Sequence, residues 1–508
     1  MTHVGIDLGT TFSAISFIDA IGNPCIVPVK EGDRICPSLV YKSGPNNFKV
    51  GQIAASMAET EPEKVAGNFK RGMPFGKVIS LDGEEYSVIE MSSMILKKLK
   101  DDFETTQGAI SSAVITIPAN WQEAGRQATL LAAEKAGLPT KHIINEPTAA
   151  ILAIAKNKPL SGIVVVYDLG GGTFDVTIAK VNGSDVEVLS SEGDSSLGGR
   201  DFDLALLKHA SAKFKERHGV PLVVEGTSNS VEFRRYQHKF ETAKKNLSFL
   251  DKTEIVLHKA GYDPFILTVT RNEFNAMISV WLDKADTLVD VVLDNAGISP
   301  SDIDEIVLVG GSTRIPNVRS RITRTFGKEP FEAGVNVDEC VCLGAAIFAG
   351  VKAPKTTLTL VQKSALASVS IRDVTPAFFG TLTVDGDGSN KNFNSIILHK
   401  DVPLPCSAQD SFYTVHSNQT VVDCRITQSG YEESDPNMVD IVGSIELELP
   451  AGRGSNKEVT VTYSYDENGM MHCEFKDLES GRTAEYGHSH AVSAGKEDEI
   501  NLEDFIID

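Results

Sequence analysis

The sequence lacks a long apolar segment, a secretory signal and a cysteine framework. No run in its 508 residues approaches the about 18 to 20 apolar residues of a membrane helix, so we expect no membrane association. The first residues have neither the basic nor the apolar region of a signal peptide. The seven cysteines form an odd, scattered set that predicts no disulfide framework. Together these absences predict a cytoplasmic protein with reduced cysteines.

Positive charge is also scarce. Lys and Arg number 48 against 69 Asp and Glu, which gives a formal net charge of −21. Because so acidic a surface repels phosphate backbones, we expect no nucleic-acid partner. The 41% hydrophobic and 23% charged residues are typical of a globular chain, and the length predicts two or three domains.

Residues 1–353 alternate strand-like and helix-like segments. Short apolar runs such as Ala113–Ile117 and Ile163–Tyr167 end at turn residues, as buried strands do. Helix-like segments lie between them, including the alanine-rich Gln122–Lys135, which stops at Gly137. This alternation predicts an α/β domain.

The pattern changes after Pro354. From Asp373 to about Tyr486 the chain alternates polar and apolar residues between many turn signals, and Asn468 and Gly469 predict a hairpin. We therefore expect an all-β domain at 373–487, joined to the first by a linker at 354–372. The remaining stretch, 488–508, is polar and then acidic, and we expect it to be mostly disordered.

Two glycine-containing motifs in the α/β region follow strand-like runs and repeat each other. Val4–Thr11 contains an Asp, a glycine turn and threonines, and Val166–Asp175 repeats this order with Asp168 in the place of Asp7. Glycines let backbone amides approach a phosphate, and paired carboxylates can hold the waters of a Mg²⁺ ion. Two such copies predict two lobes that enclose one nucleotide.

Two further segments have the chemistry of a nucleoside site. Gly310–Pro316 follows the strand-like Ile306–Val309, and its Arg314 could stack on a base. Within Val231–Phe249, the helical spacing places Glu241, Lys244, Lys245 and Ser248 on one face. A solvated helix face is the alternative interpretation of that spacing.

These motifs, in this order, resemble those of the seventy-kilodalton heat-shock (DnaK-type) chaperone family. Ile144–Ala150, Leu197–Asp203 and Asp373–Pro376 also match that family. The resemblance extends from residue 1 to about 486. It implies an actin-like, two-lobed ATPase domain at 1–353, followed by a β-sandwich that binds peptides. Actins and sugar kinases share the first fold but have no such sandwich.

The resemblance implies that the first domain binds ATP or ADP with Mg²⁺, with K⁺ as a further candidate ion. Asp7 and Asp168 would hold the hydrated Mg²⁺, and Lys70 would neutralise charge that develops on the γ-phosphate. Glu146 and Asp175 would lie near the attacking water. The remaining contacts to phosphates and adenosine would come from Gly9, Thr10, Thr11, Gly170, Gly171, Gly172, Thr173, Gly198, Gly199, Glu241, Lys244, Lys245, Ser248, Gly310, Gly311, Ser312, Arg314 and Asp338.

The β domain would bind an unfolded or extended polypeptide in a cleft, through main-chain hydrogen bonds and one apolar pocket. A J-domain protein and a nucleotide-exchange factor are the other partners that the family implies. The alternative interpretation is that the same apolar residues only fill a sandwich core. The pocket would be lined by Thr381, Val384, Phe412, Val415, Val422 and Cys424.

Four features depart from the family. Too few residues follow the sandwich to build the helical lid, so we expect a lidless cleft and faster peptide release. Residues 356–372 lack the family's leucine-rich acidic linker, which weakens the expected coupling, although Pro118 and Arg126 match the interdomain switch pair. His142 replaces a basic residue used in J-domain docking. Arg200 replaces a glutamate, which could change how the lobes close around nucleotide.

The sequence leaves three functions open. The first is an ATP-driven, lidless peptide-binding chaperone, favoured by the full set of hydrolytic residues. The second is an ATP-binding scaffold in a fixed complex, for example with a J-domain protein, favoured by the altered linker. A sugar kinase or filament-forming protein is the third, and it leaves the β domain unexplained. Leu502–Asp508 is expected either to bind back onto an ATPase domain or to act as an acidic solubilising tail.

Overall fold

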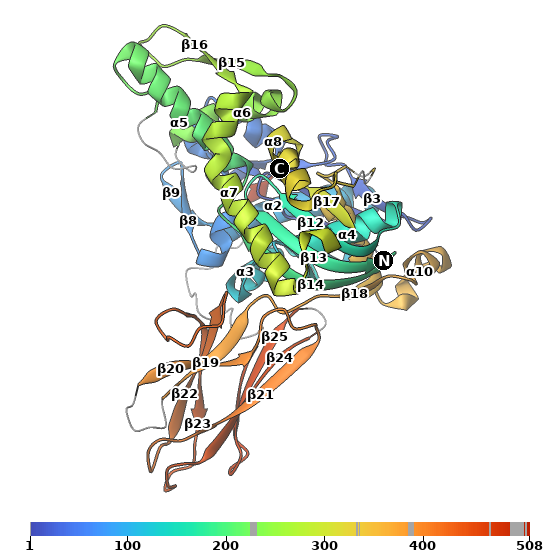
Figure 1. The fold of residues 1–508 in the computed structure, drawn as a ribbon, viewed down its shortest axis with the longest axis vertical. Helices are drawn as coiled ribbons and strands as arrows, with labels where there is room; N and C mark the ends of the chain where they lie inside the picture. The colour runs from blue at the N-terminus through green and yellow to red at the C-terminus, as the bar shows by residue number, and fades with distance from the viewer. Residues whose placement is uncertain are drawn as a thin grey trace.

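An α/β body of two lobes lies above a β-sandwich along the longest axis of the molecule (Figure 1). The computed structural model describes residues 2–223, 231–331, 334, 336–384, 391–466, 469–487, 502 and 505–508. Within this part of the chain, none of the helices is both long and apolar enough to cross a bilayer. The seven cysteines are all free.

The first lobe is built on a sheet with the order β11-β10-β1-β2-β3, in which β4 also pairs with β2. β1 pairs antiparallel with β2 and parallel with β10, so the carboxyl ends of β1 and β10 lie at the same edge. The strands are β1 (Thr2–Asp7), β2 (Phe12–Ile18), β3 (Pro24–Val27), β4 (Cys36–Pro37), β10 (Ile110–Ile117) and β11 (Thr140–Asn145).

The second lobe repeats this arrangement in the order β17-β12-β13-β14-β18. β12 pairs antiparallel with β13 and parallel with β17, as β1 does with β2 and β10. The sequence repeat is therefore also a repeat of topology, and it places Asp7 and Asp168 at equivalent strand ends. The strands are β12 (Ser161–Leu169), β13 (Phe174–Asn182), β14 (Asp185–Asp194), β17 (Glu305–Val309) and β18 (Ser370–Arg372).

Two helices, α4 (Glu146–Asn157) and α9 (Cys340–Lys352), pack closely on each other in the core between the sheets. Gly344 on α9 faces the backbone of Ala149 on α4, which explains why no side chain is present there. The other helices are α1 (Gln52–Met57), α2 (Val88–Gln107), α3 (Glu123–Lys135), α5 (Gly199–His218), α6 (Val231–Phe249), α7 (Arg271–Ala296), α8 (Pro316–Phe326) and α10 (Leu360–Leu366).

Each lobe carries a smaller sheet. The first lobe has a sheet with the order β27-β6-β5-β7, beside a two-stranded ribbon of β8 and β9. In the second lobe, β15 and β16 form a ribbon beside α6 (Figure 1). These strands are β5 (Leu39–Gly44), β6 (Asn47–Val50), β7 (Val65–Gly67), β8 (Val78–Leu81), β9 (Glu84–Ser87), β15 (Lys252–Leu257), β16 (Phe265–Thr270) and β27 (Ile506–Ile507).

The β-sandwich consists of two four-stranded sheets, β20-β19-β22-β23 and β21-β24-β25-β26. Their facing side chains form a separate core that includes Phe379, Ile426, Tyr463 and Phe475. The strands are β19 (Phe378–Val384), β20 (Asn392–Leu398), β21 (Cys406–Tyr413), β22 (Val421–Ser429), β23 (Asp440–Glu448), β24 (Glu458–Tyr465), β25 (Met471–Asp477) and β26 (Thr483–Tyr486).

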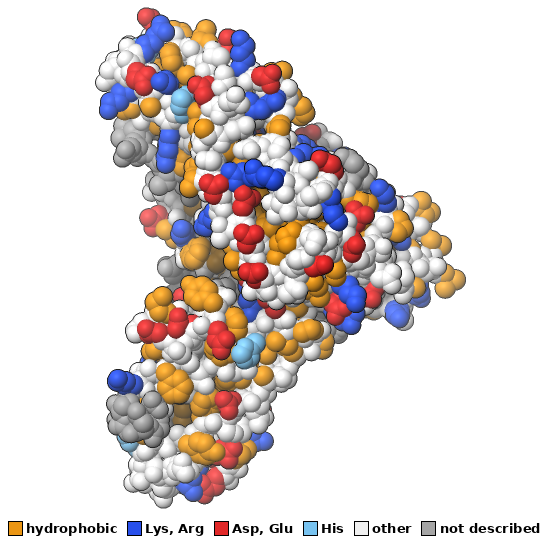
Figure 2. Space-filling model, in the orientation of Figure 1, with side chains coloured by type: hydrophobic (Ala, Val, Ile, Leu, Met, Phe, Trp, Pro, Cys, Tyr) orange, Lys and Arg blue, Asp and Glu red, His pale blue; other side chains and the backbone are white. Residues whose placement is uncertain are grey.

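The predicted linker region contains regular structure. It forms a short 3-10 helix at Lys355–Thr357, then α10, then β18, which pairs in parallel with β14. Leu360 and Val361 on α10 are exposed, and Figure 2 shows hydrophobic side chains gathered at that right-hand end of the molecule. The linker therefore joins the second lobe's sheet before the chain enters the sandwich.

The predicted disorder of the tail is wrong for its last residues. Phe505–Asp508 lie on the first lobe, where β27 pairs in parallel with β6. Phe505 and Ile507 pack on the lobe's core while Ile506 between them is exposed, as in a half-buried strand. Residues 488–501, which the sequence also predicts to be disordered, lie outside the described residues. The two strands of the predicted hairpin pair as β24 and β25, and Asn468 of its turn also lies outside them.

The contact between α4 and α9 gives a first test. A methyl group at Gly344 would lie 1.7 Å from the backbone oxygen of Ala149, so the helices must separate to admit it. Gly344→Ala should lower the free energy of unfolding by roughly 1–3 kcal/mol, measured by urea denaturation. Gly44→Ala is the control because it meets no atom within 4 Å. Equal midpoints for the two variants would contradict the packing argument.

Candidate nucleotide site

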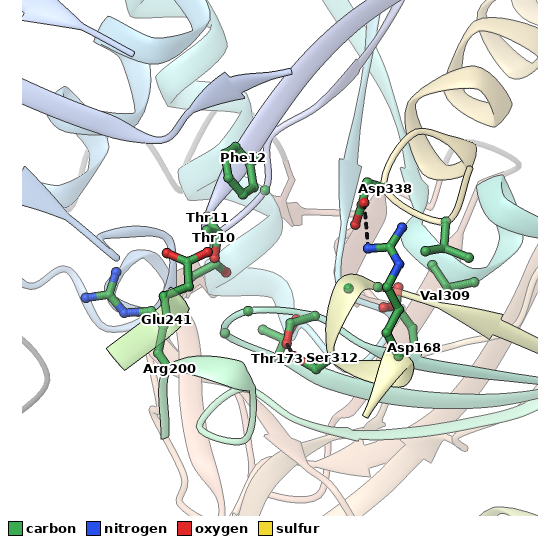
Figure 3. A pocket seen from close by; sticks show the side chains of 18 of the residues that line it. Thr10, Thr11, Phe12, Asp168, Thr173, Arg200, Glu241, Val309, Ser312 and Asp338 are labelled. Atoms are coloured by element: carbon green, nitrogen blue, oxygen red, sulfur yellow. Dashed lines mark hydrogen bonds and ion pairs between the residues drawn. The ribbon is translucent and has the colours of Figure 1, made fainter. Parts of the chain in front are cut away.

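A cavity of about 510 Å³ lies between the two lobes. The walls come from the turn after β1, the turn after β12, α6 and the turn after β17, all of which the sequence motifs had singled out. Figure 3 shows Thr10 and Thr11 on one side of it, Asp338 on the other, and Thr173 and Ser312 below. Predicted residues that line the cavity are Asp7, Gly9, Thr10, Thr11, Lys70, Glu146, Asp168, Gly170, Gly171, Gly172, Thr173, Glu241, Lys244, Lys245, Ser248, Gly310, Gly311, Ser312, Arg314 and Asp338.

Three predicted residues lie just behind the wall. Asp175, Gly198 and Gly199 do not line the cavity. A methyl group at Gly198 would lie 2.7 Å from the backbone nitrogen of Gly172, so this glycine lets α5 approach the second glycine turn. Gly199 accepts a hydrogen bond of 2.9 Å from Lys244 through its backbone oxygen. Asp175 accepts a hydrogen bond from the backbone amide of Asn120.

The two glycine turns face each other across the lobe boundary. A methyl group at Gly171 would lie 2.0 Å from Thr11 Oγ1, and one at Gly172 would lie 2.3 Å from Thr10 Cγ2. Only glycine allows the two turns this close approach. As a result, backbone amides from both lobes border the same small volume, which is the arrangement that cradles phosphate groups.

A cluster of buried acids lies beside these turns, with Lys70 among them. Burial, then the charge of Glu146, raises the pKa of Asp7 to about 7 and that of Asp175 to about 8. The same causes raise the pKa of Asp168 well above its ordinary value. Lys70 forms an ion pair with Glu146, and its ammonium lies 5.5 Å from the centre of the Trp121 ring. The acids are therefore only partly compensated.

This excess of buried negative charge fits a cation such as Mg²⁺. Hard divalent cations take oxygen ligands, and the raised pKa values show that another positive charge would stabilise the ionised carboxylates. Among the described residues, however, no group of three His, Cys, Asp or Glu side chains is placed to bind a metal ion by itself. Asp7 and Asp168 would thus hold the ion together with water and phosphate oxygens.

The opposite end of the cavity is less acidic and partly apolar. On α6, Lys245 pairs with Glu241 at 2.7 Å, and Lys244 pairs with Asp203 at 2.9 Å. Arg314 pairs with Asp338 at 2.8 Å, the dashed contact in Figure 3. All four chosen positions on α6 line the cavity, although the Lys245 side chain is 62% exposed. Lining residues that the motifs did not identify include Phe12, Ile35, Gln237, Phe249, Ile315, Val337 and Val341.

Arg200, expected to alter how the lobes close, points to α6. Its guanidinium lies 5.5 Å from the centre of the Phe233 ring and donates a hydrogen bond to Gln237. Burial and the neighbouring Arg71 lower its pKa to about 10. The ion pair that crosses between the lobes is made by Asp201, the residue after Arg200. Arg71 of the first lobe donates hydrogen bonds to both Asp201 carboxylate oxygens and to the Gly172 carbonyl.

The sandwich is docked on the lobes through polar contacts. Asn145 donates a 2.9 Å hydrogen bond to Asp373, and Arg126 donates one of 3.2 Å to Asn145. Burial raises the pKa of Asp373, partly offset by its hydrogen bonds and by Arg126. The Pro118 carbonyl accepts a hydrogen bond from the Trp121 amide at 3.1 Å.

Further docking contacts reach both lobes. On the first lobe, the Tyr465 hydroxyl donates to Glu123 at 3.3 Å, and Met470 is buried in the lobe's core. On the second lobe, Lys400 pairs with Glu192, and Ser190 donates a 3.0 Å hydrogen bond to Asp401. The sandwich therefore contacts both lobes at once.

The six predicted peptide-pocket residues do not share one surface. Thr381 and Cys424 are buried, and Phe412 and Val422 pack against the sandwich core. Val384 is exposed and, three residues from Thr381 on β19, lies on the other face of the strand. Val415 is exposed in the loop after β21. The pocket therefore stays a prediction, and the core-filling alternative accounts for Cys424.

The acid cluster predicts how stability depends on pH. The pKa of Asp175 is about 8 in the folded protein and ordinarily 3.8, so its contribution to stability is largest below about pH 4 and is lost as pH rises through 8. Asp175→Asn removes the ionisable carboxyl group, so the variant does not lose this stability as the pH rises. The nucleotide-free variant should melt above wild type at pH 8, with a smaller difference at pH 5. Scanning calorimetry measures both, with exposed Asp263→Asn as the control. A pH-independent difference would contradict the assignment.

The fold and site now agree with one family. A family model described as "Hsp70 protein" matches residues 3–503, which is nearly the whole described chain. The match spans both glycine turns, the cavity between the lobes and the sandwich. Members of this family are generally ATPases that bind ATP or ADP with Mg²⁺ and act as chaperones. The chain belongs to the Hsp70 family.

Proposed function

We propose that this chain is an ATP-dependent chaperone in which hydrolysis of ATP changes how the β-sandwich is held on the lobes. The sandwich binds extended apolar segments of unfolded polypeptides. The compartment is the cytoplasm, and a J-domain protein and a nucleotide-exchange factor assist the cycle.

The chemistry rests on Lys70 and the acids around it. ATP enters with its phosphates against the glycine turns, where Asp7 and Asp168 would hold a hydrated Mg²⁺ ion that would offset part of the phosphate charge. Lys70 then exchanges Glu146 for the γ-phosphate, where its ammonium stabilises the charge that develops in the transition state. Glu146, freed from the pair, and Asp175 orient the attacking water and take up its proton. Burial, which raises the pKa of Asp175 to about 8, suits it to hold a proton near neutral pH.

One observation carries the proposed coupling between site and sandwich. Glu146, which pairs with Lys70, is the next residue to Asn145, which donates a hydrogen bond to Asp373 at the start of the sandwich. Thr148, one residue beyond Pro147, donates to the same carboxylate at 3.3 Å. Any movement of the first turn of α4 on hydrolysis therefore acts on the residue that leads into the sandwich. The two states would differ in whether Asp373 keeps these donors.

A scaffold with little hydrolysis remains the second candidate. It is favoured by the many docking contacts on both lobes, which would hold the sandwich in one arrangement. In that case ATP binding would stabilise a fixed complex with a partner such as a J-domain protein.

Single-turnover hydrolysis of ATP distinguishes the two candidates. Lys70→Ala should lower the rate by at least about 100-fold while ATP still binds, because a single preorganised charge contributes that much to a transition state. Lys213→Ala, at an exposed position on α5, should keep the wild-type rate. Tight binding of ATP with no cleavage by wild type would favour the scaffold instead.

Peptide stimulation tests the coupling. Asp373→Ala removes the acceptor of Asn145 and Thr148, so an apolar peptide should no longer speed hydrolysis, while the basal rate stays within about twofold. Asp410→Ala, exposed on β21, is the matched control and should retain stimulation. If Asp373→Ala responds to peptide as wild type does, the Asn145–Asp373 contact does not carry the signal.

A further inference from the structure

The last described residues of the chain form a strand on the first lobe. The Ile506 amide donates to the Asn46 carbonyl at 2.9 Å, and the Asp508 amide donates to the Phe48 carbonyl at 3.1 Å. In return, the Val50 amide donates to the Asp508 carbonyl at 2.7 Å. This segment follows the sandwich in sequence, yet it completes a sheet of the ATPase lobe as its edge strand.

Apolar side chains anchor this strand. The Phe505 ring meets the Phe48 ring edge-on at 5.2 Å, and Leu502 is buried in the core of the lobe. Ile507 packs against the same core, whereas Ile506 is 60% exposed. The alternation of buried and exposed residues is that of a strand with one face on a core. The segment is thus built for this position.

Charge complements the apolar contacts. The Asp508 carboxylate pairs with Lys49 at 2.5 Å. Its hydrogen bond and ion pair with Lys49, with smaller contributions from Lys30 and Lys98, lower the pKa of Asp508. The surface next to β6 therefore favours an apolar strand that carries acidic residues, as this tail does.

The sheet that receives the tail leads to the catalytic lysine. Its order is β27-β6-β5-β7, and β7 ends at Gly67, three residues before Lys70. Phe69, beside Lys70, shares a core with Phe48 and Leu502. The tail also connects at its other end to the sandwich, because Gly487 follows β26. It therefore spans the sandwich and the lobe that holds Lys70.

We propose that Leu502–Asp508 is an intramolecular latch: by adding a strand to β6, it ties the sandwich to the first lobe and steadies the sheet that positions Lys70. The β6 edge takes this chain's own tail as its occupant. Fourteen residues lie between Gly487 and Leu502, and the fifteen steps from one to the other span at most about 54 Å, so a seated tail limits how far the sandwich can move away. Release of the tail from β6 would let the sandwich move farther from the first lobe and would expose the β6 edge. Only the effect of the latch on ATP hydrolysis rests on the proposed function.

Hydrogen exchange in the absence of nucleotide tests the latch. In the full-length chain, Phe505→Asp should speed exchange of the Val50 amide by at least about tenfold, because that amide is bonded to the tail. Ile506→Thr, with its exposed side chain, should stay within about twofold of wild type. Unchanged exchange at Val50 in Phe505→Asp, or equal acceleration by both variants, would overturn the proposal.

The same experiment separates the two parts of the proposal. The Ser370 amide, bonded to the Ser184 carbonyl at 3.1 Å, reports whether the linker strand stays docked. Phe505→Asp should also speed its exchange if the tail holds the sandwich in place. Exchange that changes at Val50 but not at Ser370 would overturn the role in tethering the sandwich.

A peptide with the sequence of Leu502–Asp508, added to the Phe505→Asp protein, should restore protection at Val50. The same peptide carrying the Phe505→Asp change should not, and restoration by both peptides would overturn the specificity of the edge. These measurements need no ATP, so they hold whether or not the chain hydrolyses it. If the latch is confirmed and single-turnover hydrolysis is equal in Phe505→Asp and wild type, the effect on Lys70 is overturned.

Discussion

The structure depends on four buried carboxyl groups that meet at the junction of the two lobes. Asp7, Glu146, Asp168 and Asp175 come from four different elements, and Lys70 supplies the nearby positive charge. Burying so many acids costs free energy unless cations arrive. A cation bound beside these carboxylates, as proposed for Mg²⁺, would therefore stabilise the junction of the two lobes.

The sequence predicts many of the residues that line this cavity, because phosphate and cation chemistry needs special residue types. Glycines at close approaches, such as Gly171 and Gly172, and acids at strand ends have few structural alternatives when they occur in two matching copies. The apolar lining, such as Ile35 and Val337, could not be found in this way. An apolar residue that faces a ligand has the same local pattern as one that faces a core.

The same limit explains why the tail is predicted wrongly and why the peptide pocket stays a prediction. The tail is rich in acids, and composition alone predicts disorder, but the short apolar pattern around Phe505 finds a partner strand more than 450 residues away. The sequence does not say to which side of a strand each predicted pocket residue points. On β19, Thr381 and Val384 lie on opposite faces. Strand pairing and facing are set by distant parts of the chain, which local patterns do not report.

The segments that flank the sandwich each add a strand to one of the lobes. β18 joins the sheet of the second lobe immediately before the sandwich, and β27 joins a sheet of the first lobe after it. Together with the side-chain contacts of the sandwich to both lobes, these two strands make the sandwich a bridge between the lobes. A change in the angle between the lobes would have to strain these contacts or release some of them. If the proposed cycle requires the lobes to open, the bridge would oppose that movement.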